Sequence, residues 1–245
     1  MSNQMPSLRV GILQCDEVRS ELRIKHGDYN NMIIDAITKI DPSLDCVTYR
    51  IFEGQVPDSE HACDAWITTG SRQSVNDDTI LSRELESFIL RVSKSTYPFI
   101  GICYGMQMIA KVLGGTVERS PVGWGIGVKK GKINSLKPWM NCNLSKNISL
   151  LFCHEDRVGK LPAEAECIGS YKSCPNAIIS VGSSIIGFQG HPEFTPSYIK
   201  QLIDDRKNLI SSEVIKASLS SLKNEIDNTQ VFRWIVNFMH SHSKF

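Results

Sequence analysis

The sequence predicts an α/β fold: a doubly wound, mostly parallel β-sheet with helices on both faces. Short apolar runs, which suit strands buried on both faces, alternate with segments that have a helical period. Such repeated strand–helix–strand units pair their strands in parallel and place the connecting helices on the two faces. After residue 116 short β-like runs follow one another with little helical period. This change predicts hairpins or a meander added to the sheet.

Four strands and three helices are expected in the first half of the chain. The strands are four apolar runs: Leu8–Leu13, Cys46–Phe52, Ala65–Thr69 and Phe99–Ile102. Asp28 is expected to cap a helix over about 29–39, and Asp77 or Asp78 to start a second helix that continues to Val92. The third helix follows Cys103 directly and ends at the glycine pair 114–115.

The second half is expected to add short strands and then helices. The strand candidates are Ile126–Val128, Ile148–Cys153, Ile178–Val181 and Ile185–Phe188. Thr195 followed by Pro196 is typical of a helix start, here for a helix to about Asn208, and a last helix is expected over Thr229–His240. We therefore predict one domain over 1–245, with a core of about 7–205 and a helical C-terminal extension of about 206–245.

Composition excludes several classes of function. The 245 residues carry 27 basic and 26 acidic side chains, so the net charge of +1 gives no general attraction to nucleic acid or an anionic membrane surface. No apolar run approaches the roughly 20 residues of a membrane-spanning helix. The start, MSNQMPSLRV, lacks an apolar signal-peptide segment, and the eight cysteines are scattered. We therefore expect a cytoplasmic protein with reduced thiols.

The segment around Cys103 predicts a cysteine nucleophile. A side chain between a parallel strand and the next helix sits on a sharp turn, and the residues two before and two after must be small. Gly101 and Gly105 occupy these positions. The helix N-terminus favours a thiolate, and the amide of Tyr104 is free to donate to an oxyanion. The alternative is a buried structural cysteine in an ordinary strand–helix turn.

His191 is the expected partner of this thiol. It follows the apolar run 185–188, so it should reach the edge of the sheet at which Cys103 also lies. Glu193, two residues later across a stiff proline, can accept a hydrogen bond from one ring nitrogen while the other faces the thiol. The alternative is a turn histidine beside a solvated glutamate.

These two segments, Gly-Ile-Cys-Tyr-Gly-Met-Gln and Gly-His-Pro-Glu, resemble those of the class I (triad) glutamine amidotransferases, which have a flavodoxin-like sheet. The resemblance is greatest to the free-standing branch related to the glutaminase domain of GMP synthase and to γ-glutamyl peptidases. It covers about residues 7–205. It implies Cys103 as nucleophile, His191 as general base and acid, Glu193 as the group that orients the histidine, and Gln107 as a contact of the glutamyl group.

The resemblance also implies an oxyanion site at Gly70 and Ser71. The family has a glycine pair followed by proline where this chain has Gly70, Ser71 and Arg72. The amide of Ser71 can still donate, but the loop departs from the family pattern. Arg72 either binds a substrate carboxylate or is simply solvated.

Three further segments have more than one interpretation. The segment 153–156, Cys-His-Glu-Asp, could suggest a metal site, but adjacent residues do not easily converge on one ion, and by resemblance His154 belongs to a structural loop near the site. The segment 123–127, Gly-Trp-Gly-Ile-Gly, imitates a dinucleotide fingerprint, but no helical period follows, which favours a glycine-rich strand edge. Asp28 could contact substrate, although helix capping is favoured.

The implied activity is hydrolysis of a γ-glutamyl amide through a γ-glutamyl thioester on Cys103, with no metal or organic cofactor. Three hypotheses follow for the whole chain. It is a glutaminase that passes ammonia to a separate synthetase subunit, a stand-alone γ-glutamyl peptidase, or a non-catalytic binding protein on the same fold. The chain has no phosphate-binding loop of the Gly-x-x-x-x-Gly-Lys-Ser/Thr type, so a fused synthetase is not expected.

Overall fold

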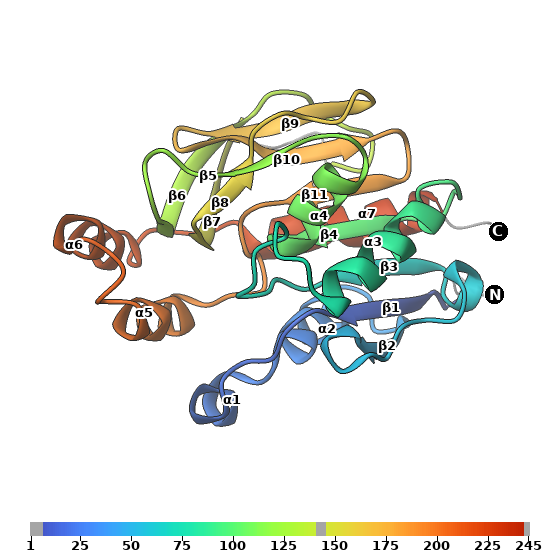
Figure 1. Cartoon of the computed structure of the whole chain (residues 1–245), viewed down its shortest axis with the longest axis horizontal. Helices are drawn as coiled ribbons and strands as arrows, with labels where there is room; N and C mark the ends of the chain where they lie inside the picture. Colours follow the sequence, from blue (N-terminus) through green and yellow to red (C-terminus); the bar gives the residue numbers. More distant parts are fainter. Residues whose placement is uncertain (1–6, 141–145, 243–245) are drawn as a thin grey trace, which may run out of the picture.

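Five parallel strands form the half of the sheet on which the predicted site depends. The computed structural model describes residues 7–140 and 146–242. The strands pair in the order β2–β1–β3–β4–β11 (Figure 1). Their bounds are β1 Arg9–Gln14, β2 Asp45–Arg50, β3 Ala65–Thr68, β4 Phe99–Ile102 and β11 Ile185–Phe188. Their carboxyl ends meet at one edge, where doubly wound sheets bind their ligands.

The predicted hairpins continue this sheet as an antiparallel half. The described residues form nine strands in it, and the order from β11 onwards is β11–β10–β9–β6–β7. The bounds are β6 Gly125–Ile133, β7 Asn147–His154, β9 Ala165–Tyr171 and β10 Cys174–Val181. A separate small sheet pairs β5 (Val117–Arg119) with β8 (Asp156–Val158).

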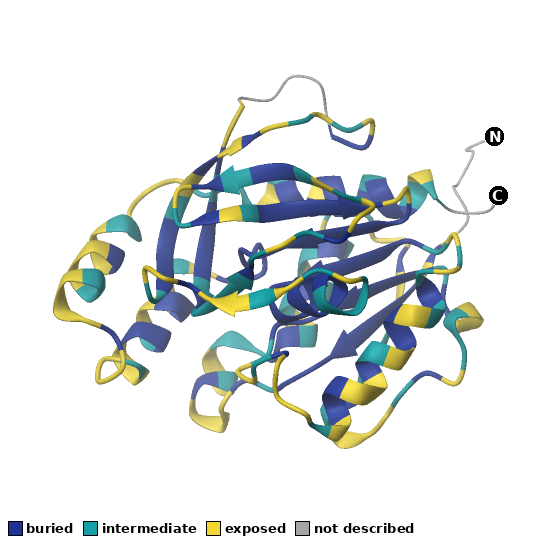
Figure 2. Ribbon diagram, turned by 45° about the horizontal axis from the view of Figure 1, so that its top comes forward, coloured by how far each residue is buried: buried dark blue, intermediate teal, exposed yellow. Residues whose placement is uncertain are grey.

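Helices cover both faces of the sheet, which confirms the predicted doubly wound fold. On one face, α2 (Tyr29–Thr38) and α7 (Asn228–Ser241) pack on alternate apolar side chains of the strands. On the other face, α3 (Ile80–Val92) and α4 (Tyr104–Val112) pack on the intervening side chains. Figure 2 shows the central strands mostly in the buried colour and exposed residues along the outer sides of the helices.

The C-terminal helices differ in how many of their side chains are buried. Trp234 and Phe238 of α7 lie fully inside the same core as β1 and β4, so the buried core extends past residue 205. In α6 (Ser212–Ser221) Ser218 is the buried residue. The helix that starts at the predicted Thr195 cap is α5 (Pro196–Asp205), and α1 (Ser20–His26) lies with α5 and α6 beyond the edge of the parallel strands (Figure 1).

One of the two predicted helix caps is confirmed and the other is wrong. Asp28 caps α2 through a hydrogen bond from the amide of Tyr29. The cap of α3 is Thr79 and not Asp77 or Asp78, because Thr79 and Ser82 form a reciprocal capping box. The carboxylate of Asp77 accepts from the amide of Ser74, and Asp78 pairs with Arg83, so both are engaged elsewhere.

The structure tests the expectations about membrane-spanning helices and cysteine thiols within the described residues. Within 7–140 and 146–242, no helix is long and apolar enough to cross a membrane. The seven cysteines in those ranges are free thiols. Cys142 lies outside the described residues.

Candidate active site

The turn between β4 and α4 holds Cys103 in a strained conformation. Cys103 has φ of +51° and is the only non-glycine residue with positive φ in the described part of the chain. Both flanking glycines are required by packing. A Cβ on Gly101 would lie 2.6 Å from the backbone of Gly105, and a Cβ on Gly105 would lie 1.5 Å from Oγ1 of Thr68. The sharp turn and its two small residues are therefore present as predicted.

His191 is fixed by backbone, carboxylate and ring contacts. Its amide donates to the carbonyl of Leu151 in β7 at 2.7 Å, which ties the segment after β11 to the antiparallel half of the sheet. Its Nδ1 lies 2.7 Å from Oε1 of Glu193, and both side chains are buried. The ring of Phe194 stacks on the imidazole at 3.9 Å with an interplanar angle of 3°. Because Nδ1 faces Glu193, Nε2 is the ring nitrogen that can face the thiol of Cys103.

Cys103 and His191 meet beside Gly70, the glycine that follows β3. A Cβ on Gly70 would lie 2.9 Å from Cε1 of His191 and 3.7 Å from Cβ of Cys103. Any larger residue at position 70 would therefore collide with the histidine ring. The side-chain Nε2 of Gln189 also donates to Sγ of Cys103, at 3.4 Å. The structure thus brings together the residues that the sequence proposes as nucleophile, base and orienting carboxylate.

The charges around His191 favour its protonated form. Burial by itself lowers the pKa of this imidazole, but the negative charge of Glu193, together with the charge and hydrogen bond of Cys103, outweighs it and raises the pKa well above its usual range. A protonated imidazole beside a nucleophilic thiol can supply a proton to a leaving group.

The thiol and the imidazole open into a cavity of about 540 Å³. Gly70, Ser71 and Gln107 line it on the side of β3 and α4. Phe194, Leu202 and Arg206 line it on the side of α5. The cavity therefore extends well beyond the reacting atoms.

The sequence profile of the family described as "Glutamine amidotransferase class-I" matches residues 25–207. This match covers more than half of the chain. The chain belongs to the class I glutamine amidotransferase family.

Two relatives are similar to the chain in sequence, and two solved amidotransferase structures share its fold. It is 26% identical over 228 residues to "Gamma-glutamyl peptidase 2" of Arabidopsis thaliana, covering 91% of each chain. It is 32% identical over 150 residues to a GMP synthase (glutamine-hydrolyzing) of Hamiltonella defensa, covering 55% of this chain and 29% of that one. Glutamine amidotransferase structures from Thermotoga maritima and Methylobacillus flagellatus each superpose with a TM-score of 0.74 at 18% and 19% identity, covering 96% of this chain and 97% and 94% of theirs.

The residues that the amidotransferase resemblance implies for substrate lie around the thiol. Ser71 lines the cavity. Tyr104 is the first residue of α4, so its amide has no acceptor in an earlier turn of the helix. Its phenol is buried away from the thiol's cavity. The amide nitrogen of Gln107 donates to the carbonyl of Asp156 and to Oε1 of Gln189, so its side chain is held in place.

Arg72 forms an ion pair that neither of its two expected roles included. Its guanidinium forms two hydrogen bonds to the carboxylate of Asp16, at 2.7 and 2.8 Å, and its amide forms a third at 2.9 Å. Burial alone would raise the pKa of Asp16, but the bonds from Arg72 outweigh it and lower the pKa. The pair fastens the loop after β3 to the loop after β1.

His154 lines the cavity but differs electrostatically from His191. Its Nδ1 lies 2.9 Å from the carbonyl of Asp156, and burial lowers its pKa to about 4. A neutral imidazole results, without a carboxylate partner. Within the described ranges, no three His, Cys, Asp or Glu side chains are arranged to hold a metal ion.

Sequence reasoning missed two residues of the amidotransferase site. Gln189 contacts both the thiol and Gln107, and the only available signal was an amide directly after the last apolar residue of a strand. Phe194 stacks on His191, but an aromatic residue after a turn gives no sign of its contact. The glycine-rich segment 123–127 leads into a strand, as the sequence predicts, because β6 begins at Gly125.

Proposed function

We propose that this chain hydrolyses the γ-amide bond of γ-glutamyl compounds with Cys103 as nucleophile, His191 as acid and base, and Glu193 as the group that orients the histidine. The observation that carries the proposal is the thiol of Cys103, on its strained turn, in one cavity with the imidazole of His191, which Glu193 holds through Nδ1. Membership of the class I amidotransferase family supports the same chemistry.

The reaction has two halves. The Cys103 thiolate attacks the γ-carbonyl carbon, the C–N bond breaks, and the imidazolium of His191 gives its proton to the leaving nitrogen. Neutral His191 then takes a proton from water, whose oxygen attacks the thioester carbon. The C–S bond breaks, and glutamate leaves while the thiolate and imidazolium are restored. The net change is addition of one water across the amide.

The oxyanion and the glutamyl group need separate partners. Amides of Ser71 and Tyr104 are the proposed donors to the oxyanion, because both residues flank the thiol on its β3 and α4 sides. Gly70 leaves room beside the thiol, since any Cβ there would meet the His191 ring. The amide nitrogen of Gln107 is occupied by Asp156 and Gln189, so its oxygen is the atom proposed to accept from the glutamyl ammonium.

Two candidates for the leaving amine have support. An amine larger than ammonia is favoured by the 91% coverage shared with a γ-glutamyl peptidase and by a cavity within the roughly 300–1,000 Å³ typical of ligand sites. Ammonia, passed to a separate synthetase subunit, is favoured by the similarity to the GMP synthase over 150 residues. We give preference to the larger amine.

Because the mechanism needs a reduced thiol, we also propose a cytoplasmic location.

A substrate panel with a nucleophile variant tests the proposal. Purified protein is given glutamine and a series of γ-glutamyl peptides, and glutamate release is measured. We expect faster release from peptides than from glutamine, and a loss of at least about 10⁴-fold in Cys103→Ala. Cys153→Ala, which removes another thiol of the same cavity, is the matched control and keeps activity. Release from glutamine only with an added synthetase would favour the ammonia candidate. No glutamate release from any of the substrates would favour a non-catalytic protein.

A further inference from the structure

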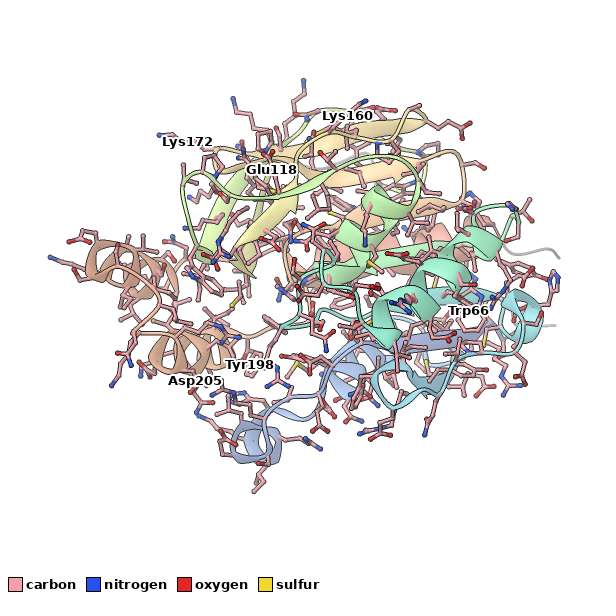
Figure 3. The ribbon with its side chains drawn as sticks, viewed as in Figure 1. Trp66, Glu118, Lys160, Lys172, Tyr198 and Asp205 are labelled. Atoms are coloured by element: carbon pink, nitrogen blue, oxygen red, sulfur yellow. The ribbon has the colours of Figure 1, made fainter. Side chains whose placement is uncertain are left out.

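The cavity has a second wall that the proposed chemistry does not use. Trp124, just before β6, lines it together with residues on and after α5. Tyr198 and Leu202 are four residues apart, so they lie along one face of α5, and Arg206 follows directly after its last residue as the C-cap. Figure 3 labels Tyr198 and Asp205 near the two ends of this helix.

This wall begins at the catalytic histidine. Phe194 stacks on His191, and the ring of Tyr198 packs edge-on against Phe194 at 4.8 Å. Leu202 is one turn further along α5. The guanidinium of Arg206 reaches back toward this turn, because its Nη1 donates to the carbonyl of Leu202 at 3.3 Å. The wall therefore runs from His191 through aromatic and aliphatic groups to a positive charge.

Arg206 differs from the other arginines of the cavity. Arg72 pairs with Asp16, Arg19 with Asp205, and Arg119 with Glu155. Within residues 7–140 and 146–242, no carboxylate forms an ion pair with Arg206. Its guanidinium lies over the ring of Trp124, 5.8 Å from the centroid. Stacking on an aromatic ring orients a guanidinium and leaves its edge free to bind an anion.

We propose that Trp124, Leu202 and Arg206 form a subsite for the leaving amine, and that this amine is a short peptide with an apolar first residue and a free terminal carboxylate. The proposal rests on the proposed function. The leaving nitrogen must take its proton from His191, so the amine lies along the wall that starts there. The apolar side chain packs on Trp124 and Leu202, and Arg206 binds the carboxylate with its free donors.

A matched pair of substrates tests the subsite. γ-Glutamyl-leucyl-glycine and its C-terminal amide differ only in the terminal carboxylate, and kcat/KM is measured for both. We expect the native protein to prefer the carboxylate by about 10- to 100-fold, the range of a hydrogen bond to a charged group. In Arg206→Gln this ratio should fall toward one, mainly through KM. The ratio is taken within one protein, so it does not depend on the fraction that folds.

Matched controls separate the subsite from general charge. Arg119→Gln and Arg19→Gln remove cavity arginines that already have carboxylate partners, and both should keep the ratio. Trp124→Ala should lose preference for γ-glutamyl-leucyl-glycine over γ-glutamyl-glycyl-glycine.

Other results would overturn the subsite or the function separately. Equal cleavage of acid and amide by the native protein would overturn the subsite alone. The subsite would also be overturned if Arg206→Gln lowered kcat/KM for glutamine as much as for the peptide, because Arg206 would then bind the glutamyl carboxylate. No cleavage of any γ-glutamyl compound would instead overturn the proposed function.

Discussion

Glu193 controls the charge of His191 at the scale of single residues. Its Oε1 contacts Nδ1 of the imidazole at 2.7 Å, and its negative charge is the largest influence that raises the pKa of His191 against the effect of burial. Its other oxygen, Oε2, is buried without a hydrogen-bond partner. Within the described residues, His191 is therefore the hydrogen-bond partner of this carboxylate. A substitution that keeps the shape of the side chain and removes its charge tests the effect of that charge on His191.

Glu193→Gln should shift the pH dependence of catalysis. The substitution keeps the shape but removes the negative charge, so the pKa of His191 falls. The imidazolium that protonates the leaving group is then lost at lower pH. We expect the alkaline limb of the kcat/KM profile to move to lower pH. We also expect kcat to fall by about 10²-fold or more. A profile with an unmoved alkaline limb would contradict this role of Glu193.

His154→Gln tests the neutral histidine through stability. His154 has a pKa of about 4 in the folded protein, against roughly 6.5 in an unfolded chain. As pH falls, the unfolded chain binds a proton that the folded protein does not, so His154 costs stability below pH 6.5. Urea unfolding at pH 7.5 and 5 should show that the native protein loses about 2 kcal/mol more than the variant. Equal losses would mean that His154 is protonated in the fold.

The sequence predicts the reacting residues of the site better than their supports. Cys103 lies between two glycines and His191 precedes a proline. The glycines can be recognised in the sequence because a larger residue at either position would collide with its neighbours. Gln189 and Phe194 contact the same two residues through tertiary packing alone. Arg72 shows the same limit, since its partner Asp16 lies 56 residues away.

At the scale of elements, short buried strands are the most predictable. β4 and β11 have the predicted bounds, because each is an unbroken apolar run buried on both faces. α1 was not predicted, since Leu22 is its one buried residue and Ile24 is 94% exposed, so it has no apolar stripe. β9 was missed for a related reason, because its sequence AECIGSY has no regular alternation.

Trp234→Ala tests whether α7 is a structural layer of the sheet. Trp234 is fully buried against the core, and its ring packs edge-on near Trp139 at 6.4 Å. Truncation should lower the free energy of unfolding by about 3–5 kcal/mol, as measured by urea denaturation. Leu219→Ala on the half-exposed face of α6 is the control and should change it by less than about 0.5 kcal/mol. Similar values for both variants would make α7 a peripheral helix.

At the scale of the whole molecule, the two halves of the sheet meet at the reacting pair. Cys103 follows a parallel strand, whereas His191 is tied by its amide to Leu151 in the antiparallel half. α5 then closes the cavity from the end of the sheet, with Leu202 and Arg206 in its wall. A thiol, an imidazole and a binding wall from three parts of the chain therefore converge only in the folded protein.

Trapping the covalent intermediate tests this convergence most directly. Native protein is quenched in acid during turnover of a γ-glutamyl peptide, digested and mapped by mass spectrometry. We predict that the mass of one γ-glutamyl residue is added to the peptide that carries Cys103, and that no such adduct forms in Cys103→Ala. Turnover with an adduct on another residue, or undiminished turnover in Cys103→Ala, would contradict the assignment of Cys103 as the nucleophile.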